Sequence, residues 1–105
     1  MRRGEIWWAD LESPAGQRSV VLLSLDEAYS VRKLVVTAPV TTRIRNIPSE
    51  VPLGMAEGMS QDCVANLDII TTISKNCLSS RLTALNQVKM KELEAAIHFS
   101  LGMEL

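Results

Sequence analysis

The segment Leu34–Thr42, which reads LVVTAPVTT, restricts the possible folds most strongly. Its β-branched residues favour a pleated, half-buried strand. Pro39 lies inside this segment and cannot donate a hydrogen bond to a neighbouring strand, which predicts a bulge or an edge position. We therefore expect a strand whose pairing is irregular near Pro39.

Other short segments carry the same strand signals. The aromatic segment Gly4–Leu11 precedes the turn-forming residues Ser13, Pro14 and Gly16, which predicts a strand followed by a short loop. Trp7 and Trp8 are consecutive within it, so in a regular strand they point to opposite faces. The remaining predicted strands are Arg18–Ser24, Ser49–Gly54 and a longer, bent strand at Asp62–Ser74.

Helical signals are concentrated at the C-terminal end. Residues 74–81 are expected to form one or two helical turns, and Leu85–Met103 should form a helix that begins at the N-cap Asn86 and ends at Gly102. Its expected buried face has apolar residues spaced by three and four positions. These are Leu85, Val88, Leu93, Ala96, Ile97 and Leu101.

Short strands followed by one helix predict a mainly β fold, in which the C-terminal helix covers one face of a small, strongly bent antiparallel sheet or barrel. With 105 residues, of which 47% are hydrophobic and 22% charged, the chain is expected to form one domain over residues 1–105. No apolar run approaches the roughly 20 residues of a bilayer span. The N-terminal MRRGEIWW lacks the pattern of a secretory signal, so we expect a cytoplasmic protein with no membrane partner.

Several kinds of catalytic site find no support in the sequence. Cys63 and Cys77 lack the CxxC spacing of a metal site, and we expect both thiols to be reduced and structural. His98 is the only histidine and lies in the predicted helix. P-loop, dinucleotide-binding, zinc-binding and nucleophile-elbow motifs are absent. We therefore expect no metal and no cofactor.

The net charge of −1 hides an asymmetry between the two parts of the chain. Residues 1–45 contain seven Lys or Arg residues and five acidic residues, whereas residues 46–105 contain four and seven. Such a distribution is compatible with a local basic face on a nearly neutral protein.

Polar residues gather at the predicted strand ends. Metal-free RNA cleavage needs a base near the 2′-hydroxyl, a proton donor and positive charge near the phosphate, and aspartate, threonine and arginine supply these groups. The same residues also fit ordinary structural roles, as surface charges, strand formers or turn residues. They are Gln17 and Arg18 before one strand, Thr41, Thr42, Arg43 and Arg45 after another, and Asn66 and Asp68 within CVANLDII.

Five segments, in order and over almost the whole chain, resemble the MazF/PemK toxins. They are RRGEIWWADL, GQRSVVLLS, VVTAPVTTRIR, DCVANLDIITTIS and LEAAIHFSLGM. The resemblance implies an SH3-like β-barrel with a terminal helix, the CcdB/PemK-like toxin fold, usually as a homodimer. It also implies a metal-independent, sequence-specific endoribonuclease acting on single-stranded RNA, an mRNA interferase, which a cognate antitoxin protein neutralises.

By position, the resemblance assigns catalytic roles to Arg18, Thr41 and Asp68, with either Asp68 or a water molecule as the base. Attack by the 2′-hydroxyl would leave a 2′,3′-cyclic phosphate and a 5′-hydroxyl end. Contacts to RNA are expected from Gln17, Ser19, Thr42, Arg43, Arg45 and Asn66.

Two departures from the family pattern leave alternatives open. Ser19 stands where a proline usually follows the arginine, and the residues after Asp68 lack the usual Gln and basic residue. One alternative is a catalytically impaired relative that serves as a protein-binding module. The other is a gyrase-binding toxin of the CcdB type, but such toxins depend on a C-terminal tryptophan, and this chain ends in Gly-Met-Glu-Leu.

Overall fold

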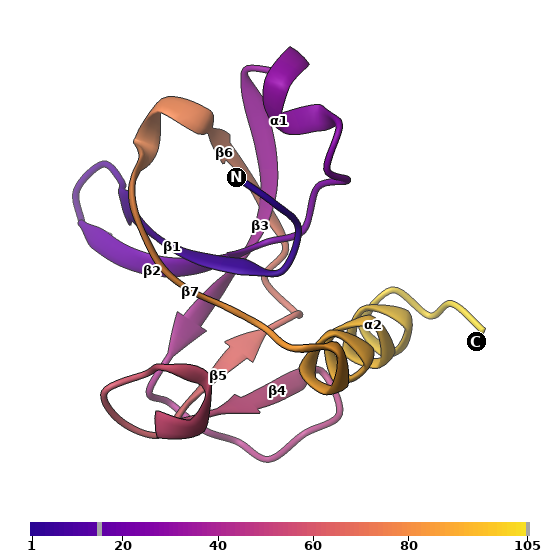
Figure 1. Ribbon diagram of the computed structural model, residues 1–105. Coiled ribbons are helices and arrows are strands. Elements are labelled where there is room, and N and C mark those ends of the chain that lie inside the picture. The colour runs from indigo at the N-terminus through magenta and orange to yellow at the C-terminus, as the bar shows by residue number, and fades with distance from the viewer. Residues whose placement is uncertain (15, 105) are drawn as a thin grey trace.

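The computed structural model describes residues 1–14 and 16–104. Over these residues the chain forms a mainly β structure that ends in a helix, as expected (Figure 1). The strands are β1 (Glu5–Asp10), β2 (Gln17–Leu22), β3 (Leu34–Thr41), β4 (Glu50–Leu53), β5 (Cys63–Asn66), β6 (Thr71–Ser74) and β7 (Leu78–Ala84). The helices are α1 (Ala28–Val31) and α2 (Gln87–Ser100), with 3₁₀ turns η1 (Met55–Glu57) and η2 (Lys75–Cys77).

The strands form one bent antiparallel sheet in the order β4-β5-β3-β2-β1-β7, with β6 also paired to β3. The first part of β3 pairs with β6 and its last part pairs with β5, so β3 joins two layers of the sheet. Because the order begins at β4 and ends at β7, the sheet does not close, and the expected barrel is correct only in a loose sense.

Pro39 lies inside the sheet, so the expected edge or bulge is wrong. It pairs with Val20 in an unshifted β2–β3 register. The Leu23 N–H donates to Val36 O, so these two residues form a hydrogen-bonded pair of the β2–β3 ladder. Hydrogen-bonded and non-hydrogen-bonded pairs alternate along an antiparallel ladder, so Pro39 belongs to a non-hydrogen-bonded pair and its nitrogen points away from β2. On the side of β3 that faces away from β2, the partner strand changes from β6 to β5 between Thr37 and Val40. The missing N–H therefore falls in a gap between two ladders.

Two expected elements between residues 62 and 81 also need correction. The predicted long strand is two strands, because the Asn66 side-chain oxygen accepts a hydrogen bond of 3.0 Å from the Asp68 N–H and turns the chain between β5 and β6. The predicted helical turns after Ser74 are limited to η2, and the rest of that segment is β7, which pairs with β1.

Helix α2 begins as expected, since the side-chain oxygen of Asn86 accepts a 2.9 Å hydrogen bond from the Lys89 N–H. Its buried face is narrower than predicted. Leu93 and Ala96 are buried, whereas Val88 and Leu101 are 68% and 58% exposed. Those two side chains lie beyond the stripe of the helix that packs on the sheet.

Replacing Asn86 with alanine removes this cap, and we expect the free energy of unfolding to fall by about 1 kcal/mol. Chemical denaturation followed by circular dichroism measures the change. Asn76→Ala is the matched control, because the exposed Asn76 side chain does not cap α2. Equal losses in both variants would contradict the role given to Asn86.

Over the part of the chain that the structure describes, the core consists of two clusters. The larger lies between the sheet and α2 and includes Ile6, Val21, Leu67 and Leu93. The smaller is built around Ala9, Val20, Leu22, Tyr29, Val35 and Leu78, and Trp7 packs against it. None of the described helices is long and apolar enough to cross a membrane.

Candidate functional site

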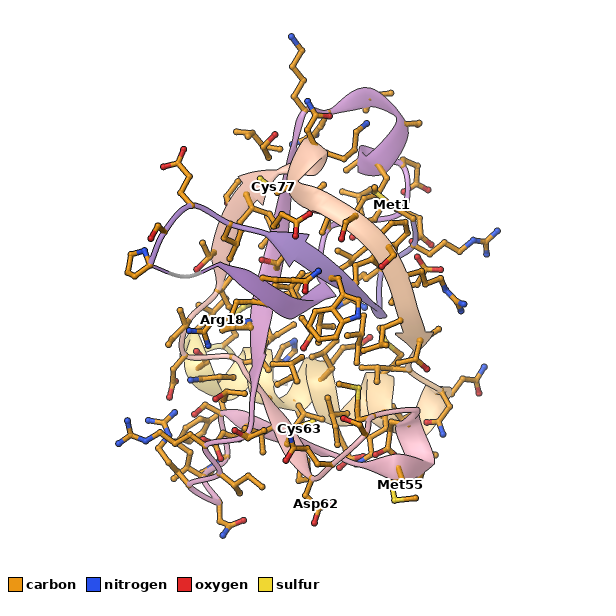
Figure 2. All side chains as sticks on the ribbon, turned by 90° about the vertical axis from the view of Figure 1, so that its left-hand side faces the viewer. Met1, Arg18, Met55, Asp62, Cys63 and Cys77 are labelled. Atoms are coloured by element: carbon orange, nitrogen blue, oxygen red, sulfur yellow. The ribbon has the colours of Figure 1, made fainter. Side chains whose placement is uncertain are left out.

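A cavity of about 320 Å³ lies where β2, β3 and β5 meet, and we call it the Arg18 cavity. It brings together five of the residues that the sequence singled out. Its lining residues are Arg18, Pro39, Val40, Thr41, Arg43, Arg45, Asn66 and Ile69. In Figure 2, Arg18 projects to the left from the start of β2, away from Met55 and Cys63.

The strand registers explain why these residues meet. Val20 pairs with Pro39 on β3, so the same register continued for two residues places Arg18 opposite Thr41. Residues that lie directly opposite each other in an antiparallel pair share one face of the sheet. Thr41 pairs with Val64 on β5, and Asn66 lies two residues further on that same face. One face of three strands thus presents an arginine, a threonine and an asparagine.

The Arg18 cavity has a basic lining. Arg18, Arg43 and Arg45 contribute guanidinium groups, and none of its lining residues is acidic. The Thr41 hydroxyl oxygen accepts a 3.2 Å hydrogen bond from the Arg43 N–H, which leaves its proton available to a ligand. Guanidinium groups suit phosphate because they donate two parallel hydrogen bonds, so the cavity is chemically suited to an anion.

Glu50 holds the segment that carries Arg45. Its side chain is only 2% exposed and forms an ion pair of 2.8 Å with Nε of Arg45. Its other oxygen accepts hydrogen bonds from the N–H groups of Arg45 and Asn46, at 2.9 and 3.0 Å. Burial alone would raise the pKa of Glu50, but these hydrogen bonds from Arg45 and Asn46 outweigh it and lower the pKa. The sequence did not predict a role for Glu50, because no local sequence pattern distinguishes a buried glutamate from an exposed one.

Asp68 lies beside the Arg18 cavity and not in its lining. Its Oδ2 accepts a 2.7 Å hydrogen bond from the Ser49 hydroxyl and lies 3.5 Å from Nη2 of Arg45. The structure therefore links Asp68 to the cavity through Arg45. Ser49, which is buried, is a second residue that the sequence did not single out.

Three other predicted residues lie outside the Arg18 cavity. Ser19 and Thr42 line a second cavity of about 320 Å³, which we call the Trp8 cavity. Gln17 is exposed at the start of β2, opposite Asp10, and lines neither cavity. The lining of the Trp8 cavity is Trp8, Ser19, Val40, Thr41, Thr42, Gly58, Met59, Ser60, Gln61, Cys63 and Leu82.

Trp7 and Trp8 point to opposite faces of β1, as predicted. Trp7 packs on the smaller core cluster, whereas Trp8 lines the Trp8 cavity.

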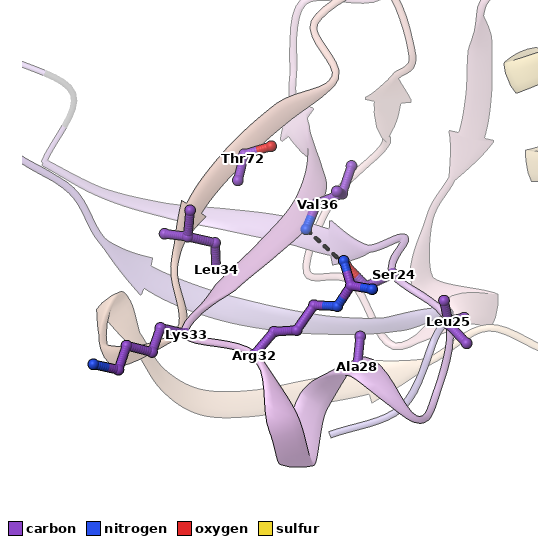
Figure 3. A pocket seen from close by; sticks show the side chains of 8 residues that line it. All are labelled: Ser24, Leu25, Ala28, Arg32, Lys33, Leu34, Val36 and Thr72. Carbon is purple, nitrogen blue, oxygen red and sulfur yellow. Dashed lines mark hydrogen bonds between the residues drawn. The ribbon is translucent and has the colours of Figure 1, made fainter.

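A larger cavity of about 610 Å³ lies near α1, at the other end of β3 (Figure 3). None of the predicted site residues lines it.

The cysteines form no disulfide, and Cys63 is buried. Burial raises the pKa of the Cys63 thiol, and the negative charges of Asp62 and Glu57 raise it further, which disfavours the thiolate form. Within residues 1–14 and 16–104, no group of three or more His, Cys, Asp or Glu side chains is arranged to hold a metal ion.

Comparisons with known proteins agree with one another. The family model described as a PemK-like, MazF-like toxin of type II toxin-antitoxin systems matches residues 2–101. Endoribonuclease MazF from Staphylococcus saprophyticus is 36% identical over 111 residues, which cover 98% of this chain and 92% of that protein. Probable endoribonuclease MazF5 from Mycobacterium tuberculosis is 34% identical and covers 90% of this chain and 87% of its own length.

Solved structures share the whole fold. The Mycobacterium tuberculosis toxin MazF-mt6 superposes with a TM-score of 0.89 at 26% identity, covering 96% of this chain and 99% of that one. A mycobacterial endoribonuclease solved in complex with its cognate antitoxin has a TM-score of 0.87 at 25% identity and covers 100% and 98%. The resemblance seen in the sequence is confirmed, and this chain belongs to the PemK/MazF family of toxins of type II toxin-antitoxin systems.

Proposed function

We propose that this chain, an endoribonuclease toxin of the MazF type, cleaves single-stranded RNA at the Arg18 cavity. The observation that carries the proposal is the lining of that cavity. Arg18 and Thr41 meet there on one face of the sheet, with two further arginines around them. This arrangement supplies positive charge and a hydroxyl donor to one phosphate group.

The proposed reaction is an internal displacement at phosphorus. The RNA 2′-hydroxyl loses its proton, its oxygen forms a bond to phosphorus, and the bond from phosphorus to the 5′-oxygen breaks. The leaving oxygen takes up a proton, so the products are a 2′,3′-cyclic phosphate and a 5′-hydroxyl end. Arg18 stabilises the negative charge that builds on the phosphate oxygens and assists the leaving oxygen, while Thr41 donates a hydrogen bond to the phosphate.

Asp68 or a water molecule takes the 2′-hydroxyl proton. The Ser49 and Arg45 hydrogen bonds both fall on Oδ2 of Asp68. Oδ1 of Asp68 accepts no hydrogen bond from the described residues, so this atom is the one that would accept the proton, directly or through water.

The remaining predicted residues hold the RNA. Arg43 and Arg45 bind phosphates next to the cleaved bond, and Asn66 bonds a base or a sugar. Gln17, exposed beside Arg18, contacts the RNA backbone at the entrance of the cavity. A single strand is the better substrate because its base edges are free to be bound.

The proposed partners are a second copy of the chain and a cognate antitoxin. A mycobacterial neighbour was solved in complex with its own antitoxin, and the basic lining of the Arg18 cavity is complementary to an acidic protein segment. The reaction needs no cofactor, and we place it in the cytoplasm, where mRNA is found.

The function is tested by incubating the purified protein with single-stranded and duplex copies of one long RNA in the presence of EDTA. We expect cutting of the single strand at a limited set of sites, with 5′-hydroxyl ends that a polynucleotide kinase can label directly. Cutting that requires a divalent metal, a preference for duplex, or no cutting would contradict the proposal. Absence of cutting together with binding to a partner protein would support the impaired relative.

A further inference from the structure

The Trp8 cavity lies against the Arg18 cavity at the end of β3. Val40 and Thr41 line both, so a strand of RNA whose phosphate sits at Thr41 has its neighbouring base within reach of the Trp8 cavity. We propose that the Trp8 cavity binds one unpaired nucleobase next to the cleaved bond and so sets part of the sequence preference. This proposal rests on the proposed function.

The cavity offers two kinds of contact that a base requires. Trp8 supplies an aromatic ring and Met59 a polarisable thioether, both suited to the face of a base. Ser60 and Gln61 supply hydroxyl and amide groups that reach the hydrogen-bonding edge of a base. Unpaired bases in single-stranded RNA are commonly recognised by this combination of stacking and edge contacts.

Four polar side chains that line the Trp8 cavity are available to a ligand. Within residues 1–14 and 16–104 these side chains form no hydrogen bond with one another or with the rest of the protein, and they are Ser19, Thr42, Ser60 and Gln61. The side chains of Asn66, Glu50 and Ser49 around the Arg18 cavity, by contrast, are all hydrogen-bonded. A ligand that donates and accepts at its edge would therefore find partners without breaking an internal network.

The segment that carries Met59 and Gln61 is held in one shape. The Gly54 N–H donates a 2.8 Å hydrogen bond to the Glu57 carboxylate. The Gly54 carbonyl oxygen accepts a hydrogen bond of 3.1 Å from the Met59 N–H. Gly58 has a positive φ of 87°, and a Cβ there would lie 2.9 Å from the Thr83 hydroxyl, so only glycine fits. A segment that already has its binding conformation favours selective recognition of one base, because little conformational entropy is lost on binding.

The test uses a library of single-stranded RNA with random sequence, digested by each variant and sequenced around the cut. In Gln61→Ala and Met59→Ala, we expect the base preference at one position beside the cut to fall by roughly fivefold or more, while preferences at other positions remain. Gln87→Ala on α2 and Met55→Ala on η1 are matched controls, because both side chains are exposed and lie outside both cavities (Figure 2 shows Met55). Thermal unfolding of each variant checks that the fold is retained.

The results separate this proposal from the proposed function. If the unaltered protein cuts RNA and the Gln61 and Met59 variants keep the full base preference, the base site is wrong and the function stands. Weaker binding of a partner protein together with an unchanged preference would also overturn it and assign the cavity to that protein. Failure of the unaltered protein to cut any RNA would remove both proposals together.

Discussion

Arg18→Ala should lower the rate of RNA cleavage by about 10² to 10³-fold, the usual cost of removing one group that stabilises charge in a transition state. Arg18 lines the basic cavity, and its side chain is exposed at the start of β2, so its loss opens no space in the core. The rate is measured on one RNA under single-turnover conditions, and the thermal midpoint should stay within a few degrees.

Two further variants show whether the arginine acts by geometry or by charge alone. Arg18→Lys keeps a positive charge but loses the planar fork that binds two phosphate oxygens, so most of the rate loss should remain. Arg32→Ala is the matched control, because Arg32 lines the cavity near α1, which holds none of the predicted site residues (Figure 3). Residual cleavage above about one-tenth in Arg18→Ala would reject the catalytic assignment of Arg18.

The sequence predicts strands well where apolar or β-branched residues are dense. Strand β7, which the sequence did not predict, has few such residues. Strand β7 has the sequence LSSRLTA and is largely exposed, so no alternation of apolar residues marks it. It forms through its pairing with β1, which shifts register twice. Such an edge strand depends on a partner far away in the chain. The turn after Asn66 does carry a local signal, since an asparagine two residues before its hydrogen-bonded partner is typical of such turns.

The predicted site residues that the structure brings together in the Arg18 cavity include three that share one face of neighbouring strands. Arg18, Thr41 and Asn66 share a face once the strands pair, although the sequence alone does not give the register. Ser19 directly follows Arg18, and adjacent strand residues point to opposite faces, so Ser19 lines the Trp8 cavity and not the Arg18 cavity. Asp68 lies in the turn between β5 and β6, where the sequence predicted only a bend within one long strand, and from this turn it lies beside the Arg18 cavity and not in its lining.

Glu50→Gln should have the largest effect on stability among these variants and lower the free energy of unfolding by about 2 kcal/mol. Glutamine keeps only one acceptor oxygen, so it can accept either the two backbone N–H hydrogen bonds from Arg45 and Asn46 or the one from Nε of Arg45, and it loses the negative charge that pairs with Arg45. Asn46 has a positive φ of 57°, a conformation that persists only while its surroundings hold it. RNA cleavage should fall as well, because Arg45 at the Arg18 cavity loses its ion pair with the Glu50 carboxylate. Chemical denaturation at neutral pH measures the loss, with Glu94→Gln as the control, since Glu94 is 53% exposed and its ion pair with Arg3 contributes little.

The pH dependence of this difference tests its cause. Because the pKa of Glu50 is lower in the folded chain than in the unfolded one, its stabilisation is fully present above the unfolded pKa of about 4.5. It is lost as the pH falls from there through the lower, folded pKa. The stability difference between the unaltered protein and Glu50→Gln should therefore be constant from pH 7 to about pH 5 and shrink below about pH 4. Glu5 also has a lowered pKa, since hydrogen bonds from Trp7, Arg2 and Arg81 outweigh the effect of its burial, but it is present in both proteins and cancels in the comparison. A difference that stays constant down to pH 2 would show that the variant destabilises the fold by packing and not by loss of the Glu50 charge.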